Sequence, residues 1–574
     1  MSVLVALVTA ATATAQVAGR LSGSVLDSSG AAVPGAKISV FLAGGAQAVL
    51  TAQTTSEGLF SVAGVRPEFY DLTVEARGFV NYTLRRVKVD PARETAIPPL
   101  RLELAAVRQT LEVSAAAESV QTSNAEISST VTNEQVRRLP MLDRGPLALI
   151  TTQPGVTYNG HPDAATTING QRTSYASVTM DGINVQDNYL RDNALDYVPN
   201  MLLLDQVAEF SVVTSNPSAA LGGGSSHVVF VSPSGTNEYH GSLYWQNRNN
   251  FFSANNWFNN QSGVERPFLN QNQGGGALGG PIVKDKLLFY FNYEAFRRRE
   301  QETANRTILT ADARRGVLTY RDTQGAVSKV DILQAAGARI DPLMQQILER
   351  VPGPEKINNY DLGDSSASLA RNTAGYRFLK RSNWTRDNAL FKLDYNRSPK
   401  HVFSGSYLWN RDNSDRPDVD DDYSAIPKVV NDNRSQLLSL GWRWNPRASF
   451  TNELRGGFNL APGVFATSEQ FGKFVVEGMI FSNPTNTFRR QGRDTDTYVL
   501  SDNATWARGR HSAQFGFQMQ RVSVRSFDDA GITPTLYLAM GTGQTGLTRS
   551  RLPNIRGADL DAANEMLATL AGLV

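Results

Sequence analysis

The connections between candidate strands in residues 235–519 alternate between short and long, and this rhythm restricts the possible folds more than any other feature of the chain. Strands pair through short polar turns, and much longer segments separate the pairs. The short turns are Lys284-Asp285-Lys286, Arg397-Ser398-Pro399-Lys400, Asn445-Pro446-Arg447 and Arg508-Gly509-Arg510. Short turns at one end of a sheet and long loops at the other are typical of bacterial transmembrane β-barrels, whose short side is periplasmic. A soluble sandwich has no reason to keep that asymmetry through successive hairpins.

Side chains along these strands alternate with a period of two, as expected when the two faces of a strand meet different surroundings. The strand at 287–294 places Leu287, Phe289, Phe291 and Tyr293 on one face and Leu288, Tyr290, Asn292 and Glu294 on the other. The same alternation recurs at 389–396, 403–410, 438–444 and 513–519. An apolar, aromatic outer face and a polar inner face predict a barrel wall between lipid and a wet lumen. We expect about nine antiparallel strands of this kind.

The alternative is a large soluble β protein with one polar face. Five charged residues fall on the predicted inner face, namely Glu294, Lys392, Asp394, Arg443 and Arg455. A soluble core would bury these charges without partners, at a high cost in free energy. They therefore favour the barrel.

Composition excludes several other classes. The chain has 574 residues, of which 41% are hydrophobic, and its mean hydropathy is −0.30. No internal run approaches the roughly 20 apolar residues of a spanning helix, which excludes a helical membrane protein. A net charge of +2 without a basic stripe predicts no nucleic-acid partner. The absence of cysteine excludes disulfides and thiolate chemistry.

The N-terminus resembles an export signal. Val3–Ala13 is apolar, and Ala13-Thr14-Ala15 fits a small-residue cleavage site, so we predict a signal peptide at 1–15. No Lys or Arg precedes the apolar run, so we expect the true start to lie upstream. The alternative is a short apolar N-terminus without a targeting role.

Residues 18–104 predict a separate small β-sandwich, because short strand candidates alternate with glycine turns. Four motifs resemble the carboxypeptidase regulatory-like domain: Gly23–Asp27, Val33–Ala36, Ser56–Phe60 and Ala76–Phe79. That resemblance implies a transthyretin-like sandwich without catalytic residues, and we predict no enzyme and no cofactor. We expect Asp27 to form a turn with Ser28-Ser29-Gly30 rather than to bind a ligand.

Residues 105–231 predict a middle α+β domain. Thr132-Asn133-Glu134-Gln135 is a capping box that begins a short helix. A second short helix is expected at 145–152, and strands at 177–180, 209–214 and 228–231.

Several ordered motifs in this domain and beyond it resemble TonB-dependent outer-membrane receptors. They are Leu139-Pro140, Gln153–Val156, Asn169-Gly170-Gln171-Arg172, Met180-Asp181-Gly182-Ile183-Asn184 and Gly279-Gly280-Pro281. The subgroup with a regulatory-like domain in front (Oar-like receptors) fits best. The resemblance implies that 105–231 is the plug and 232–574 part of the barrel. It also implies about 22 strands. We therefore expect an incomplete barrel, truncated at the C-terminus, where Ala562–Leu573 is an apolar, helix-like tail.

The resemblance implies energy-coupled uptake through the TonB–ExbB–ExbD complex of the inner membrane. It places the barrel in the lipid of the bacterial outer membrane and the N-terminal domain in the periplasm. The ligand class stays open between an oligosaccharide, a peptide and a siderophore. The alternative function is an outer-membrane adhesion or surface-assembly protein on the same scaffold.

A TonB-box candidate precedes the plug and consists of Gln109, Thr110, Leu111, Glu112, Val113, Ser114 and Ala115. An extended segment of this kind lends its backbone hydrogen bonds to the sheet edge of a partner. Glu112 stands where the family pattern usually has an aliphatic residue. The alternative is an ordinary first strand of the plug.

Other candidate sites are few. Phe251, Phe252, Trp257 and Phe258 lie beside amides in an outer loop and suit a sugar or a peptide, or else an aromatic girdle. Asp415–Asp422 is either a calcium loop or, as we favour, a solvated acidic loop. The five histidines are scattered without metal-ligand spacing, so no metal site is predicted.

Overall fold

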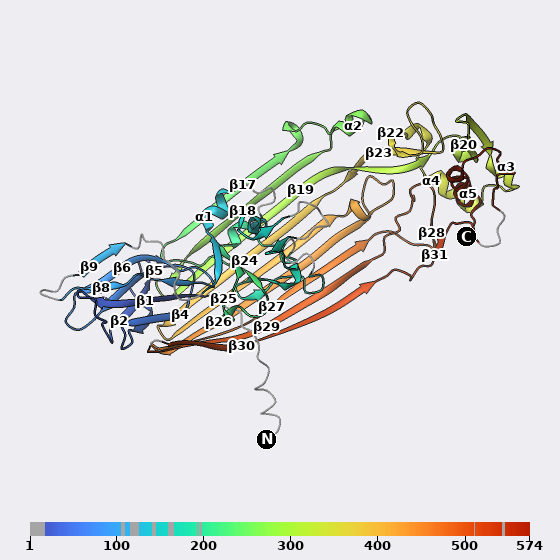
Figure 1. Cartoon of the computed structure of the whole chain (residues 1–574). Helices are drawn as coiled ribbons and strands as arrows, with labels where there is room; N and C mark the ends of the chain where they lie inside the picture. Colours follow the sequence, from blue (N-terminus) through green and yellow to red (C-terminus); the bar gives the residue numbers. More distant parts are fainter. Residues whose placement is uncertain are drawn as a thin grey trace, which may run out of the picture.

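The computed structural model describes residues 18–104, 110–114, 125–139, 145–158, 166–191, 195, 198–509, 511–541 and 546–574. Long antiparallel strands form one large sheet, with the N-terminal strands gathered at one end and short helices and strands at the other (Figure 1). The chain is therefore mainly β, as the sequence predicts.

The first eight strands form two sheets around a shared apolar core, a sandwich as predicted. One sheet contains β3-β2-β5-β6, and the other contains β4-β1-β7 with β8 also paired to β1. The strands are β1 (Gly19–Asp27), β2 (Lys37–Leu42), β3 (Ala48–Gln53), β4 (Leu59–Val65), β5 (Phe69–Glu75), β6 (Asn81–Lys88), β7 (Glu94–Ala96) and β8 (Leu100–Leu102). Asp27 forms the expected turn, because its Oδ1 accepts the amides of Ser29 at 2.8 Å and Ala31 at 2.9 Å.

Strand β9 (Thr110–Ser114) extends this N-terminal sandwich. It pairs in parallel with β6, from Asn81↔Thr110 to Arg85↔Ser114, and is the last strand of its sheet. The plug sheet does not include it, so the interpretation of this segment as an ordinary first plug strand is wrong. Gln109 and Ala115, at the two ends of the TonB-box candidate, lie outside the described residues.

The plug, here the described part of 125–231, contains a five-stranded sheet of order β10-β15-β16-β13-β14. Its strands are β10 (Ile127–Val131), β13 (Ala176–Met180), β14 (Ile183–Asn184), β15 (Glu209–Ser215) and β16 (Ser226–Val231), and a separate pair is β11 (Val156–Thr157) with β12 (Thr167–Ile168). Helix α1 (Asn133–Arg138) begins at the predicted capping box. The second helix is the 3-10 turn η1 (Pro146–Thr152).

The wall belongs to an 11-stranded sheet whose continuous path has the order β17-β18-β19-β24-β25-β26-β27-β29-β30, the nine strands expected. Two further strands, β23 (Thr373–Arg381) and β22 (Asn359–Gly363), join it through the outer part of β19. The nine strands of the path are β17 (His240–Asn249), β18 (Leu269–Val283), β19 (Leu287–Leu309), β24 (Trp384–Ser398), β25 (His401–Asp415), β26 (Val429–Arg447), β27 (Phe450–Thr467), β29 (Gln491–Arg508) and β30 (His511–Asp528). In the described residues β17 and β30 are the two edges, so the sheet is an open part of a barrel (Figure 1).

The wall strands are longer than the sequence pattern indicates; β19, for example, continues from its apolar part through the polar segment 297–306 to Leu309. One predicted turn is displaced: β26 continues through a register shift after Trp444 to Arg447, and the chain reverses at Ala448-Ser449 instead of 445–447. Arg510, in the last predicted turn, lies outside the described residues.

The two faces of the wall differ as predicted. On β19, Leu288 and Glu294 are 0% and 1% exposed, whereas Phe291 is 44% exposed. The inner face is covered by the plug, whose apolar cluster includes Tyr290, Leu390 and other wall residues. The predicted inner charges are thus buried with partners rather than bathed in a wet lumen.

Short elements form an outer cap with its own apolar core at the long-loop end of the sheet (Figure 1). They are β20 (Val317–Arg321), β21 (Val327–Asp331), β28 (Val475–Glu477), β31 (Thr535–Tyr537), α3 (Ile332–Ala336), α4 (Pro342–Arg350) and α5 (Gly557–Ala571), beside the strands β22 (Asn359–Gly363) and β23 (Thr373–Arg381) and the separate outer helix α2 (Trp257–Gln261). The predicted apolar tail is α5, which packs into this core. None of the described helices has the length and apolar character to cross a membrane.

Candidate ligand-binding site

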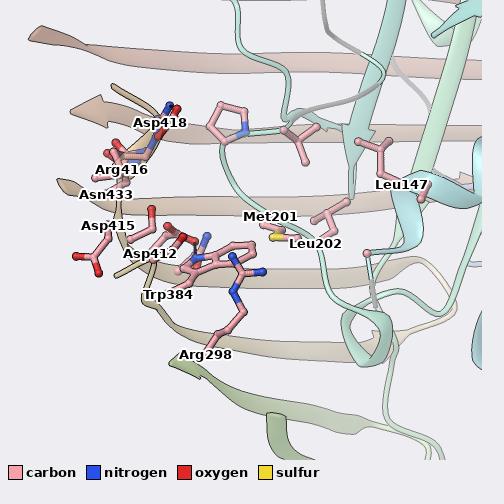
Figure 2. A pocket seen from close by; sticks show the side chains of 18 of the residues that line it. Leu147, Met201, Leu202, Arg298, Trp384, Asp412, Asp415, Arg416, Asp418 and Asn433 are labelled. Atoms are coloured by element: carbon pink, nitrogen blue, oxygen red, sulfur yellow. Dashed lines mark hydrogen bonds and ion pairs between the residues drawn. The ribbon is translucent and has the colours of Figure 1, made fainter. Parts of the chain in front are cut away.

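A cavity of about 870 Å³ lies between the plug and the outer half of the wall. Figure 2 shows its two unlike sides, with charged side chains of the wall facing apolar side chains of the plug. The apolar side includes Leu147, Ala148, Ile150, Leu195, Val198, Pro199, Met201 and Leu202. The polar side includes Arg298, Glu302, Trp384, Asn410, Asp412, Asp415, Arg416, Asp418, Asn431 and Asn433.

Hydrogen bonds to the wall fix the apolar side. The Asn388 amide donates to the carbonyl of Met201 at 3.1 Å, and the Ser435 hydroxyl donates to the carbonyl of Pro199 at 3.1 Å. The Gln206 amide also donates to Asn388. The segment around Met201 is therefore bound to β24 and β26 while its side chains stay directed into the cavity.

Most charges on the polar side already have partners. Arg381 donates two bonds to the Asp415 carboxylate, at 2.8 and 2.9 Å, the strong bidentate arrangement. The Arg416 guanidinium pairs with Asp418 at 2.8 Å. Arg298 pairs with Glu300 at 2.9 Å.

Two carboxylates of the cavity differ from these. Asp412 accepts the indole N–H of Trp384 at 2.7 Å, and Glu302 lies at the exposed rim. No Lys or Arg of the described residues lies within 4.0 Å of either carboxylate. The Arg386 guanidinium lies over the Trp384 ring, 5.2 Å from its centre, and pairs with Glu294 at 3.7 Å. Its charge also acts on the Asp412 carboxylate from beyond ion-pair distance.

The acidic loop beside the cavity is an internal ion-pair cluster. Lys380 is fully buried, and its ammonium lies 3.1 Å from both Asp420 and Asp422. Lys428 also pairs with Asp422, at 3.2 Å. The interpretation as a solvated loop is therefore wrong for these two residues, which are buried, whereas Asp421 is exposed as that interpretation expects. The Lys380 ammonium already neutralises Asp420 and Asp422, which disfavours calcium binding by them. This contact holds the loop that carries Asp418 at the rim.

Comparison with known proteins identifies the family. Residues 231–572, more than half of the chain, match the family described as "Outer membrane beta barrel domain". The chain belongs to this family. The barrel match places this protein in the outer membrane. Residues 20–105 match the carboxypeptidase regulatory-like domain, the accessory domain predicted in front of the barrel.

The relatives are transporters and receptors. The chain is 22% identical to the TonB-dependent transporter Oar of Myxococcus xanthus over 275 residues, which cover 46% of this chain and 25% of Oar. Similar structures are the outer-membrane transporter YddB from Escherichia coli (12% identity, TM-score 0.44) and the siderophore receptor PirA from Acinetobacter baumannii (11%, 0.40). Each of these two matches covers 70% of this chain and 48% of the matched structure. The chain thus spans about a quarter of the curated relative and about half of these structures.

The predicted plug motif of this outer-membrane protein lies outside the cavity. Asn169 and Gly170 have φ values of 51° and 69°, and Asp181 and Gly182 have 47° and 80°. Positive φ at both central residues defines the tight hairpin turns that favour Asn-Gly and Asp-Gly. Gln171 and Arg172 follow the first turn and are exposed. These six residues therefore shape the plug.

The predicted ligand-binding aromatics also lie apart from the cavity. Phe251 and Phe252 are 76% and 90% exposed, and Trp257 and Phe258 also point outward from their loop. They contact one another edge to face within each pair. Of the cavity residues, only the carboxylates Asp415 and Asp418 belong to a candidate site that the sequence singled out, the acidic loop. The dense Arg and Asp residues in 377–422 were the available signal for the others on the wall side.

Proposed function

We propose that this chain captures an extracellular ligand in the cavity and moves it inward by a TonB-driven displacement of the plug. The position of the cavity carries this proposal. One side belongs to the plug and the other to the wall, so a bound ligand contacts both the part that moves and the part that stays. The resemblance to a TonB-dependent transporter over 275 residues supports the same proposal.

Separable bonds hold the plug against the wall. The hydroxyls of Ser406 and Ser439 donate to the Asp181 carboxylate at 2.6 Å and to its carbonyl at 2.7 Å. Arg455 donates to the same carbonyl at 3.0 Å, and Lys392 donates to the carbonyl of Ser232 at 2.8 Å. A neutral bond of this kind contributes about 1 kcal/mol net and a bond to a charged group about 1.5–3 kcal/mol, so the plug can break these contacts one after another.

The coupling segment in this proposal is Thr110–Ser114. As β9 it has one side paired with β6 and lies at the end of its sheet in the described residues. A strand in this position suits partner binding by strand addition, because its second row of amides and carbonyls faces outward.

The test is uptake by cells that carry Leu111→Pro and Val113→Pro. Proline removes the amide that strand addition needs, so uptake should fall to background while ligand binding to the cell surface persists. The matched control is Leu111→Ala with Val113→Ala, which keeps both amides and should keep uptake. Wild-type uptake in the proline variant would contradict TonB coupling through this segment.

A second function, adhesion or surface assembly, is favoured by the outer cap. This cap buries its own apolar core, which includes Leu318, Leu333, Met344 and Met566, well outside the wall. A folded outer unit can serve a surface contact without any plug movement. Adhesion that survives in the proline variant, in a strain without measurable uptake, would support this second function over the first.

A further inference from the structure

The cavity combines an apolar plug side with an excess of carboxylates on the wall side (Figure 2). Among the residues that line it, four carboxylates face two guanidinium groups. Both guanidinium groups are engaged, Arg298 with Glu300 and Arg416 with Asp418. The remaining charge belongs to Asp412 and Glu302, neither of which has an ion-pair partner within 4.0 Å among the described residues, while Arg386 and Arg298 act on them from farther away. The groups that line the cavity therefore carry a net negative charge, which disfavours anions.

An independent observation concerns buried acceptors. Asn410 is 2% exposed and lines the cavity, and its side-chain oxygen has no hydrogen-bond partner in the described residues. The side-chain oxygen of Asn431, on the neighbouring strand β26, is likewise without a partner. A buried acceptor without a donor is costly. Both atoms, together with the Asp412 carboxylate, call for a ligand that brings hydrogen-bond donors.

We infer that the cavity binds an organic cation with an apolar body, an ammonium or guanidinium group joined to hydrocarbon. The cationic group pairs with Asp412, its N–H groups supply donors to the amide oxygens, and the hydrocarbon covers Met201 and Leu202. This inference rests on the proposed function only in taking the cavity as the ligand site. Among the ligand classes open from the sequence, it favours a basic peptide and disfavours an anionic siderophore.

Trp384 adds to this preference. Its ring forms part of the wall and already has the guanidinium groups of Arg298 and Arg386 each 5.2 Å from its centre. Its N–H is directed to Asp412 at 2.7 Å, which fixes the carboxylate in place. A carboxylate fixed in advance loses less conformational entropy when a ligand binds.

The test is equilibrium binding of a fluorescent peptide that alternates lysine and leucine to the protein in neutral detergent. The matched probe has glutamate in place of every lysine. We expect the lysine probe to bind at least ~10-fold more tightly than the glutamate probe, since opposite charges across a contact add affinity and like charges subtract it. The difference should shrink as salt rises.

Two variants locate the effect. Asp412→Asn should weaken binding of the lysine probe about 10-fold. Glu302→Gln should weaken it only about 3-fold, because the Glu302 carboxylate is exposed at the rim. The matched control is Asp421→Asn, an exposed carboxylate on the adjacent loop that does not line the cavity, and it should leave binding unchanged. Equal binding of both probes, no binding of the lysine probe, or an equal loss in the control would each overturn the inference.

Binding in detergent needs no energy source, so this test is separate from that of the proposed function. Selective binding of the lysine probe without any energy-dependent uptake would keep the inference and reject the transport proposal. Energy-dependent uptake that favours the glutamate probe would keep transport and reject the inference.

Discussion

The plug meets charged partners at both of its ends, and the two ends differ in how the charges are matched. At the periplasmic end, Arg66 of the N-terminal sandwich lies 2.7 Å from Asp394 of the wall, and Lys88 lies 2.8 Å from Glu209 of the plug. At the outer end, Arg493 of the wall also pairs with Asp187 of the plug, but Asp412 and Glu302 face the cavity with no ion-pair partner within 4.0 Å among the described residues. Matched charges join parts of the protein to one another, whereas unmatched charges leave a place for a ligand.

The largest expected effect comes from Arg66→Ala. The Asp394 side chain is 1% exposed, so the variant leaves a buried carboxylate without its ion-pair partner, although Lys392 and Ser234 still act on it. Breaking a buried pair in this way typically costs about 3–5 kcal/mol. A reporter is available because the chain has no cysteine and Leu288 of the wall is buried in the sandwich core. In a protein that carries Leu288→Cys, the added Arg66→Ala substitution should make thiol labelling at least ~100-fold faster. Each 1.4 kcal/mol lost raises the population of the open, reactive state about tenfold.

The matched control for this variant is Lys37→Ala. Lys37 pairs with Glu75 at 3.3 Å, but both side chains are about half exposed, and such pairs contribute about 0–1 kcal/mol. Labelling in the control should stay within about fivefold of the parent. If Arg66→Ala and Lys37→Ala changed the labelling rate equally, the claim that buried ion pairs stabilise the protein more than surface pairs would be contradicted.

A smaller effect is expected from Lys380→Met at the outer end. The variant removes the ammonium that lies between Asp420 and Asp422 but leaves Lys428 beside Asp422, so we expect about 2–3 kcal/mol. Protease cleavage within 416–428 should become about 30–100-fold faster. Lys329→Met, which removes an exposed pair with Asp312, is the control. An uncleaved loop would show that other contacts hold the rim.

The smallest effect is a pH dependence at Glu209. Burial raises the pKa of Glu209 to about 7, with Asp90 and Glu68 adding to the rise and the Lys88 ammonium opposing it. Because this pKa lies above the ordinary value of 4.5, the proton stabilises the docked state. That stabilisation is complete below pH 4.5 and lost as the pH rises through about 7.

Thiol labelling of the Leu288→Cys reporter, normalised to free cysteine at each pH, measures this dependence. Between pH 5 and 8 the normalised labelling rate should rise about 5–30-fold, which corresponds to a loss of about 1–2 kcal/mol of stability of the docked state. Glu209→Gln should flatten the profile, since an amide does not titrate. A profile that keeps its slope in this variant would assign the dependence to another group.

Local patterns in the sequence predicted the strands, their two faces and the positions of the short turns, except the turn at 445–447, which lies at Ala448-Ser449. The alternation of Phe291 with Asn292 reports directly on lipid and interior, because strand side chains alternate whatever the strand's distant partners. The capping box at Thr132 is local in the same sense. These features needed no knowledge of tertiary structure.

The cavity and the ion pairs could not be predicted in this way. Leu147 and Trp384 lie more than 200 residues apart in the chain, and only the position of the plug within the wall brings them together. Lys380 and Asp420 are 40 residues apart, so the acidic loop can be recognised in the sequence but the lysine that neutralises it cannot. The same holds for Arg66 and Asp394, which belong to different domains.

The parallel pairing of β9 with β6 has a mechanical consequence. The five pairs between Thr110–Ser114 and Asn81–Arg85 share any tension that runs along the strand axis, because all of them are sheared at once. Tension across that axis instead opens the pairs one at a time, which needs much less force. Lys88, at the end of β6, continues the connection to Glu209 in the plug. The direction of pull on one short strand therefore decides whether force reaches the plug or is released at the edge of the sandwich.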